Sequence, residues 1–443
     1  MARGWSAAGF ISLSAAIPAQ ALAQDEAPAS VAAPAIASVS SGDTGWVLAA
    51  SALVLLMTLP GLTLFYGGLV RARSFVSVCL QCAAIASVAS LVWIGVGYTL
   101  AFGRVSQGWI GGGNALFLAD LGTLRPGTAI PESAFALFQM TFAVIAPALM
   151  VGAWAERARF GWVLGFAGLW VVIVYAPVAH WIWGGGWLAN QFGTLDFAGG
   201  LVVHTTSGVS AVVVALLVGP RKGFPTTPML PHAPALTLMG AALLWVGWFG
   251  FNGGSALSAN DNAASAILAT HIAASAAALT WMLAEALSVG KPTAVGWATG
   301  AIAGLATITP AAVFVSPGAA IVFGVLAALV CYGVIQQMKH RWHVDDTLDV
   351  FAVHGVGGMI GAILLAIFLS PSFGGTGYFG EATMASQLVA QATGIGAVAL
   401  WSAVGSAIIA LMVSLFVPMR VSESDEAAGL DRASHGESAW HFD

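Results

Sequence analysis

The sequence predicts an all-α polytopic membrane protein with about 11 transmembrane helices, its N-terminus outside the cell and its C-terminus inside. Hydrophobic residues make up 58% of the 443 residues and charged residues only 7%, and the mean hydropathy is +0.88. A soluble domain could not bury that much apolar surface. Long apolar stretches recur along the chain, and basic residues stand in short segments between them.

Residues 1–23 have the pattern of a cleaved secretory signal peptide. Arg3 supplies a basic start, an apolar run extends from Ala7 to Ile17, and Ala21-Leu-Ala23 forms a small-residue cleavage site. Residues 24–43, rich in Ala, Pro and Ser, would then form a short extracytoplasmic segment.

The rest of the chain offers about 11 stretches that approach the roughly 20 apolar residues required for a membrane-spanning helix. These stretches are 45–70, 75–100, 133–155, 161–183, 198–219, 235–256, 263–288, 293–311, 318–338, 348–369 and 386–418. Residues 44–220 form a first half and residues 221–418 a second half with one additional span, followed by a tail at 419–443.

The basic residues test this assignment independently, because short cytoplasmic loops collect Lys and Arg. Eleven of the 14 Lys and Arg residues follow odd-numbered stretches or lie in the tail. They are Arg71, Arg73, Arg157, Arg159, Arg221, Lys222, Lys291, Lys339, Arg341, Arg420 and Arg432. This distribution predicts an odd number of spans with the tail in the cytoplasm.

The fifth and tenth stretches share a pattern, in which an Asp near the start precedes a His that is followed four residues later by Gly. The two sets are Asp196, His204, Gly208 and Asp349, His354, Gly358. We expect each Asp to cap the start of its helix. The pattern indicates two five-helix halves of opposite orientation, an inverted repeat that places a substrate site between the halves near the membrane midplane.

His204 and His354 are the most informative residues, because an ionisable group inside a membrane span is costly and is a functional hypothesis by default. A single buried histidine more often bonds a neighbouring helix. Two histidines at matching places in opposite halves instead favour a pair that lines a narrow path and passes a proton.

Other kinds of chemistry find little support. Cys79, Cys82 and Cys331 lie in apolar stretches and are interpreted as small core residues. No Cys, Glu or third His accompanies the two histidines at metal-ligand spacing, so we expect no metal and no cofactor. The absence of a nucleophile–base pair at depth argues against an enzyme, and nothing indicates a nucleic-acid partner.

Aromatic residues crowd the outer side of the same region. Trp181, Trp183 and Trp187 surround a Gly-Gly-Gly segment. Tryptophan at this depth normally belongs to the interfacial belt, but a ring that faces a pore can hold a small cation. Further candidates for such contacts are Phe138, Gln139, Phe142 and Phe251.

Six segments together carry a resemblance to a known family. They are Gly61-Leu-Thr-Leu-Phe-Tyr-Gly-Gly-Leu-Val-Arg71, Ala153-Trp-Ala-Glu-Arg157, Trp183-Gly-Gly-Gly186, Asp196-Phe-Ala-Gly-Gly200, Gly247-Trp-Phe-Gly-Phe-Asn252 and Val353-His-Gly355. From about residue 44 to the tail, the sequence resembles the ammonium transporters of the Amt/Mep/Rh family, specifically the bacterial Amt branch. It shows neither the additional N-terminal span nor the departure at Trp183 expected of the Rh type.

The resemblance implies a protein that recruits NH4+ at an outer aromatic site, deprotonates it and conducts ammonia with its proton, electrogenically, through a narrow hydrophobic pore. By position, Phe142, Trp183 and Ser255 would form the recruitment site. Phe142 and Phe251 would be the stacked rings of a gate below that site.

The resemblance also implies that His204 and His354 are the twin histidines of the pore and that Asp196 supports the recruitment site. It further implies a homotrimer in the lipid bilayer of the bacterial inner membrane, with methylammonium as a further candidate substrate.

In the tail, Gly429-Leu-Asp431 and His435-Gly-Glu437 resemble the cytoplasmic motif of bacterial Amt proteins. The resemblance implies binding of a PII-type signalling protein through Gly429, Leu430, Asp431, His435, Gly436 and Glu437. The family usually ends this motif with Tyr, whereas this chain has Trp440. The alternative function is an ammonium sensor that signals through the tail, although such sensors usually carry an additional domain.

Overall fold

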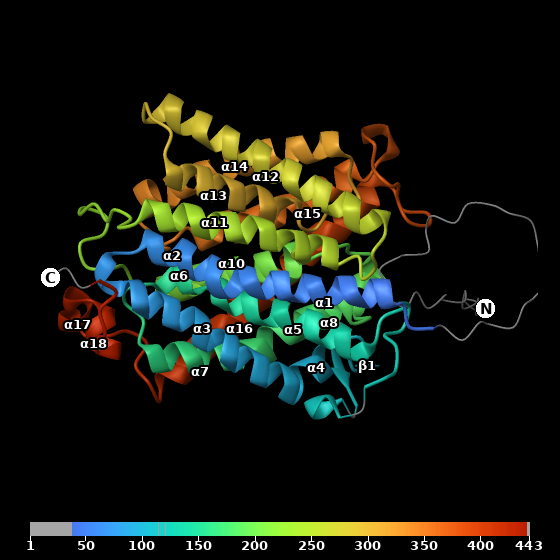
Figure 1. Cartoon of the computed structure of the whole chain (residues 1–443), viewed down its shortest axis with the longest axis horizontal. Helices are drawn as coiled ribbons and strands as arrows, with labels where there is room; N and C mark the ends of the chain where they lie inside the picture. Colours follow the sequence, from blue (N-terminus) through green and yellow to red (C-terminus); the bar gives the residue numbers. More distant parts are fainter. Residues whose placement is uncertain (1–37, 114, 120, 441–443) are drawn as a thin grey trace, which may run out of the picture.

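The computed structural model describes residues 38–113, 115–119 and 121–440, and the expected signal peptide lies outside the described residues. Within these described residues, ten helices are long and apolar enough to cross a membrane, by length and composition. They run along one common direction (Figure 1), with helices α17 (Glu423–Ala428) and α18 (Leu430–His435) at one end and the start of α1 (Ser41–Leu56) at the other. We name these two ends the tail face and the opposite face.

The first half contains five of these helices; short π-helical turns interrupt three of them and form the start of a fourth. The elements are α1, η1 (Met57–Leu62) and α2 (Thr63–Leu69); η2 (Ala72–Ser74), α3 (Phe75–Val92), η3 (Trp93–Gly97) and α4 (Tyr98–Phe102); α5 (Glu132–Leu149) and α6 (Val151–Trp154); α7 (Phe160–Trp170), η5 (Val171–Tyr175), α8 (Ala176–Trp183) and α9 (Trp187–Phe192); and η6 (Gly200–Thr205) with α10 (Thr206–Val218). Between α4 and α5, strands β1 (Arg104–Ser106) and β2 (Ile110–Gly112) form an antiparallel hairpin, followed by η4 (Leu116–Leu118).

The second half contains the other five long helices and one shorter helix. The elements are α11 (Pro234–Trp248) and η7 (Phe249–Gly253); α12 (Asp261–Ser288); α13 (Ala294–Ile308); α14 (Pro317–Gln337) and η8 (Met338–Trp342); η9 (Phe351–Val356), α15 (Gly357–Phe368) and η10 (Pro371–Phe373); and α16 (Met384–Ser414).

The shorter helix, α13, corresponds to the predicted stretch 293–311 and has 15 residues, fewer than the ten long helices. Helices α11, α12, α14 and α15 all pack against it. A Cβ atom at Gly304 would lie 2.6 Å from the Cβ of Ala277 on α12, so the glycine permits this close packing. Because protein surrounds α13, its ends need not reach both surfaces of a bilayer.

Two helices that begin with π-helical turns, η6 with α10 and η9 with α15, cross near the middle of the bundle. Helix α10 packs against η9, and α15 packs against η6. A Cβ atom at Gly208 would clash with the backbone of Gly355, and a Cβ atom at Gly358 would clash with the carbonyl oxygen of Gly200. The contacts are reciprocal, as expected for two halves in an inverted relation.

Candidate functional site

A column of aromatic and imidazole rings leads from the opposite face to the helix crossing. The ring of Trp183 meets that of Phe142 edge-on at 5.9 Å, and Phe142 lies 4.3 Å from Phe251 at an interplanar angle of 34°. Phe251 stacks on His204 at 5.9 Å, and His204 stacks on His354 at 5.2 Å. The structure therefore brings five residues singled out in the sequence into one continuous line.

The column becomes less accessible along its length. The exposed fraction is 9% at Trp183, 1% at Phe142 and 0% at Phe251. The Oγ of Ser255 is near the same place, because it donates a hydrogen bond of 2.8 Å to the carbonyl oxygen of Phe251. Any solute that enters from the opposite face would meet Trp183 first.

The two histidines make a direct contact, with 3.2 Å between the Nδ1 atoms of His204 and His354. One ring must donate and the other must accept in this hydrogen bond, so the pair shares a proton between its two Nδ1 atoms. Both residues are buried, and the Nε2 of His204 finds no partner among the described residues. The pair can thus hold or pass a proton.

Trp248 is a member of the site that the sequence analysis did not single out. Its ring stacks on His204 at 5.3 Å, and its indole Nε1 donates a hydrogen bond of 2.9 Å to the hydroxyl of Thr309. It lies three residues before Phe251, within the same matching segment. Nothing in its local pattern separates it from the other tryptophans of the chain.

The remaining aromatic candidates surround the column or lie outside it. Phe138 packs on Phe142 at 4.9 Å. Trp181 and Trp187 pack instead against Trp109, next to the β-hairpin. The buried Oε1 of Gln139 has no partner among the described residues.

Asp196 holds the start of η6 and, through its backbone, the outer ring of the column. Its carboxylate accepts four backbone N–H hydrogen bonds of 2.7 to 2.9 Å, from Gly199, Gly200, Leu201 and Val202. Its carbonyl oxygen accepts a hydrogen bond of 2.7 Å from Nε1 of Trp183. The carboxylate satisfies backbone donors that a helix start leaves free.

The second half differs from the expectation that Asp349 caps the tenth stretch. The carboxylate of Asp346 instead accepts the N–H of Phe351 at 2.7 Å, whereas Asp349 forms an ion pair of 2.8 Å with Lys339. Asp349 has a φ of +63°, outside the helical range, which places it in the turn before η9. Asp346 lies eight residues before His354, as Asp196 lies eight residues before His204, so Asp346 is the counterpart of Asp196.

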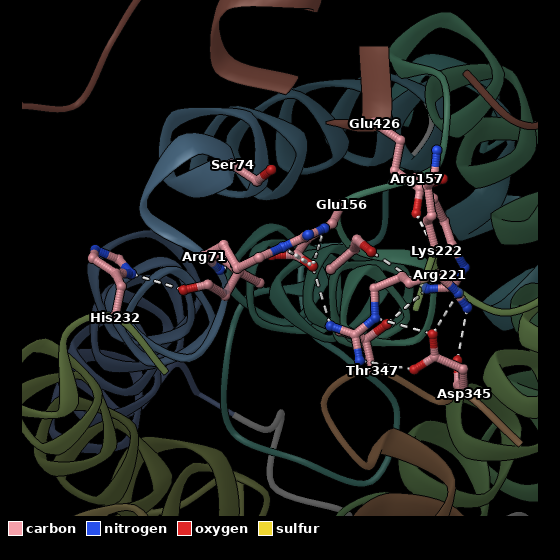
Figure 2. Close-up of polar contacts among 12 residues, drawn as sticks. Arg71, Ser74, Glu156, Arg157, Arg221, Lys222, His232, Asp345, Thr347 and Glu426 are labelled. Carbon is pink, nitrogen blue, oxygen red and sulfur yellow. Dashed lines mark hydrogen bonds and ion pairs between the residues drawn. The ribbon is translucent and has the colours of Figure 1, made fainter. Parts of the chain in front are cut away.

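On the tail face, a buried network of ion pairs joins the loops that follow α2, α6 and α10 to the turn before η9 (Figure 2). Glu156 pairs with Arg71 at 2.9 Å and Arg221 at 3.2 Å, and Arg221 also pairs with Asp345 at 2.8 Å. Burial alone would raise the pKa of Glu156, but Arg221 and Arg71 hold it below its ordinary value. The pKa of Asp345 is likewise lowered, because Arg221 outweighs the effect of burial.

Arg157 lies beside this network and is fully buried. Its guanidinium donates hydrogen bonds of 2.7 to 3.3 Å to the hydroxyl of Thr347 and to four carbonyl oxygens. These carbonyls belong to Ala153, Ala155, Gly219 and Asp345. A single side chain therefore ties together three loops of the tail face.

The tail folds back onto its own chain. The carboxylate of Asp431 accepts the N–H of Ser77 at 2.8 Å, in the first turn of α3, and Leu430 is buried. Glu426 accepts hydrogen bonds of 2.7 Å from the N–H of Lys222 and from Arg420. His435 packs edge-on against Phe160, while Gly436 and Glu437 stay exposed.

Trp440 also packs onto this surface. Its ring lies 5.9 Å from Phe75 and 6.2 Å from His232. Among the residues that the structure describes, no group of three or more His, Cys, Asp or Glu is arranged to hold a metal ion. The three cysteines are free thiols.

Comparison with known proteins connects this geometry to a family. The family model described as Ammonium Transporter Family matches residues 45–440. An ammonium transporter of Aquifex aeolicus is 44% identical over 92% of this chain and 95% of its own length. One of Bacillus subtilis is 43% identical over 90% of this chain and 98% of its own length.

Solved structures agree with this match. A protein described as a sensor Amt protein has a TM-score of 0.83 and 32% identity, over 89% of this chain and 98% of its own. Mep2 of Saccharomyces cerevisiae has a TM-score of 0.80 and 34% identity, over 87% of this chain and 90% of its own. The chain belongs to the ammonium transporter family.

Proposed function

We propose that this protein takes up NH4+ between Phe142, Trp183 and Ser255, removes one proton and conducts ammonia past His204 and His354. The ring column supports this proposal, because aromatic faces attract a cation where the column is most open. Farther in, closely packed rings leave no room for a hydrated ion. The observation that carries the proposal is the 3.2 Å contact between the two imidazoles.

Deprotonation explains how such a path would select its substrate. Ammonium and potassium ions are nearly the same size, so fit alone would not separate them, but only ammonium can release a proton. Moving a full charge to the membrane centre costs roughly 2.5–3.5 kcal/mol even on lenient scales. Neutral ammonia avoids most of this free energy, so the closely packed rings of Phe142 and Phe251 act as a gate against ions.

The histidine pair gives the released proton a place to go. A pair that already shares one proton can accept another on one side and release one on the other. We therefore propose that the proton crosses with ammonia and that transport is electrogenic. Asp196 supports the recruitment site indirectly, through its bond to Trp183 and its negative charge. No enzymatic step is required.

Single histidine variants test this assignment. We predict that His204→Ala and His354→Ala each abolish ammonium flux into proteoliposomes or weaken its discrimination against potassium by at least tenfold. His340→Ala, an exposed histidine on the tail face, is the matched control and should behave like wild type. If both pore variants keep wild-type flux and selectivity, the histidines do not handle the proton.

We further propose a homotrimer in the bacterial inner membrane, with one pore per subunit, the opposite face outside and the tail face in the cytoplasm. Basic residues such as Arg71 and Arg221 gather on the tail face, as cytoplasmic loops require. His271 is exposed on α12, where contact with lipid would be costly and a neighbouring subunit would shield it. Native mass spectrometry should find three chains, and a predominant single chain would contradict the trimer.

The tail is the proposed contact for a PII-type signalling protein. His435, Gly436 and Glu437 have surface that a partner could reach, whereas Leu430 and Asp431 are occupied by the chain's own loops. A purified PII-type protein should bind proteoliposomes that carry the full chain and not those that carry a chain ending at 418. Equal binding to both would show that the tail is not part of the interface.

Similarity to a protein described as a sensor Amt protein favours a second candidate function, an ammonium sensor. A sensor would change the exposure of its tail upon addition of ammonium and show no sustained ammonium flux. Measuring flux and tail proteolysis on the same proteoliposomes separates the two functions.

A further inference from the structure

Asp196 and Asp346 occupy equivalent places before the two pore histidines, but they bond differently. Asp196 uses both carboxylate oxygens, each of which accepts two N–H groups. For Asp346, Oδ2 accepts the N–H of Phe351, while Oδ1 is buried with no partner among the described residues. Asp346 is only 1% exposed. A buried carboxylate oxygen without a protein partner is free to bind a proton or a water molecule.

The other two acids of this turn are neutralised by cations. Asp345 pairs with Arg221 at 2.8 Å, and Asp349 pairs with Lys339 at 2.8 Å. For Asp346, no cation lies within ion-pair distance among the residues that the structure describes. Of the three acids, Asp346 is the one whose charge has no direct counter-charge, so a change in its protonation breaks no ion pair.

Asp346 also stands at the end of the pore that faces the tail. Asp346 lies in the turn before η9, eight residues before His354 in the sequence, and its neighbour Asp345 pairs with Arg221 in the tail-face network. Tyr66 borders the same place, because a Cβ atom at Gly152 would lie 3.1 Å from both Cζ of Tyr66 and Cβ of Leu348. The turn that holds Asp346 thus leads directly into η9, which carries His354, and borders the tail-face network.

We propose that Asp346 receives the proton from the histidine pair and releases it to water at the tail face. This inference rests on the proposed function. Ammonium gives one proton to the pair and leaves as ammonia. The pair passes a proton, through intervening water, to Oδ1 of Asp346, and returns to its neutral form. The resulting carboxylic acid loses its proton to bulk water, so one positive charge crosses for each ammonia.

The electrostatic surroundings suit a group that exchanges protons near neutral pH. Burial, and then the negative charge of Asp349, raise the pKa of Asp346 to about 7. Lys339 acts in the opposite direction. The charged and titratable groups around the turn are Asp345 and Asp349 beside it in sequence, Lys339 on η8, Arg157 after α6, Arg221 after α10 and Tyr66 on α2.

These surroundings determine the direction in which the ammonium-driven current changes with pH. Only the carboxylate form of Asp346 can accept a proton, and this form predominates above its pKa. The ammonium-driven current of wild type should therefore rise with pH and show an inflection near 7. Asp349→Asn removes a negative charge and frees Lys339, and both changes lower the pKa of Asp346, so the inflection should move to lower pH.

The test records ammonium-driven current and ammonia flux in proteoliposomes over a pH series. Asp346→Asn keeps an oxygen for the N–H of Phe351 but cannot take up a proton, so the current should fall at least tenfold and lose its inflection. Asp346→Glu restores an acid and should recover part of the current. Asp349→Asn is the matched control and should keep the current with a shifted inflection.

The outcomes separate this inference from the function on which it rests. If wild type carries no ammonium-driven current, both the electrogenic transport of the proposed function and the role of Asp346 are wrong. Wild-type current together with an Asp346→Asn variant of equal current and the same inflection would overturn the role of Asp346 alone. An Asp349→Asn inflection at the wild-type pH would overturn it as well, even if Asp346→Asn failed to fold.

Discussion

Asp196 illustrates how one side chain can fix the start of a helix and the orientation of a neighbouring ring. Its two oxygens satisfy four N–H groups at the start of η6, and its carbonyl oxygen orients the indole of Trp183. Hydrogen bonds to a charged acceptor each contribute about 1.5–3 kcal/mol, and a buried donor left unpaired costs a similar amount. The outer end of the ring column therefore depends on a residue that need not contact the substrate.

We predict that Asp196→Asn lowers the free energy of unfolding by about 3 kcal/mol, because the amide group would present N–H donors to two of the four backbone donors. Thermal unfolding of the purified protein in detergent measures this effect. Asp261→Asn, an exposed acid in the first turn of α12, is the control and should change the same quantity by less than about 0.5 kcal/mol. Similar unfolding temperatures for both variants would contradict the capping role.

At this scale the sequence predicted which residues meet but not every contact. Family motifs placed Phe142, Phe251 and His204, which the structure brings into one column. The acid that caps η9 could not be chosen from sequence, because three acids stand within five residues and only the backbone turn at Asp349 decides among them. Trp248 was missed for a similar reason, since its contact with His204 depends on how α11 of the second half packs against η6 of the first half.

At the level of secondary structure, the packing of α10 on η9 and of α15 on η6 brings the two histidines together. Gly208 and Gly358 each stand four residues after a pore histidine, and each contacts the backbone of the opposite helix. A side chain at either position would push the helices apart and separate the imidazoles. The spacing of histidine and glycine in the sequence thus has a geometric cause.

We predict that Gly208→Ala and Gly358→Ala each lower the free energy of unfolding by about 1–3 kcal/mol, the range for overpacking. Both variants should also reduce ammonium flux by more than tenfold. Gly396→Ala on α16 is the matched control, because a Cβ atom there meets nothing within 4 Å. This control should be neutral or slightly stabilising, since alanine favours a helix over glycine by about 1 kcal/mol. Wild-type flux in Gly208→Ala would show that the close crossing is unnecessary.

A separate prediction concerns how the tail is held against α3. Asp431 serves as a cap for α3 from a distant part of the chain, and a cap is typically worth about 1 kcal/mol. Asp431→Ala should therefore release the tail and speed its cleavage by protease after residue 418 severalfold. Ser434→Ala, at an exposed position on α18, should leave the cleavage rate unchanged. If both variants are cleaved at the wild-type rate, Asp431 does not hold the tail.

Hydropathy predicted the long elements well, because apolar length is the property that a bilayer selects. It did not predict the π-helical turns of η6 and η9, which contain the two histidines, since they follow from backbone hydrogen bonding and not from apolar content. The predicted stretch 293–311 corresponds to α13, whose 15 residues pack against α11, α12, α14 and α15. Local pattern cannot report such tertiary context.

Over the whole molecule, two polar systems are built into a largely apolar bundle. One is the histidine pair at the helix crossing, and the other is the network of Glu156, Arg221 and Asp345 on the tail face. The sequence analysis treated the basic residues only as markers of orientation. The structure shows that Arg157 and Arg221 also bind the loops of the tail face to one another.

The central claim is that the two histidines separate a proton from ammonium and let both cross. The most direct test is the current on an ammonium pulse in proteoliposomes, with wild type beside the double variant His204→Ala/His354→Ala. The account predicts a transient inward current for wild type, and for the double variant either no current or a current that potassium also drives. Ammonia flux without any current in wild type would contradict electrogenic transport, and an unchanged, ammonium-selective current in the double variant would contradict the role of the histidines.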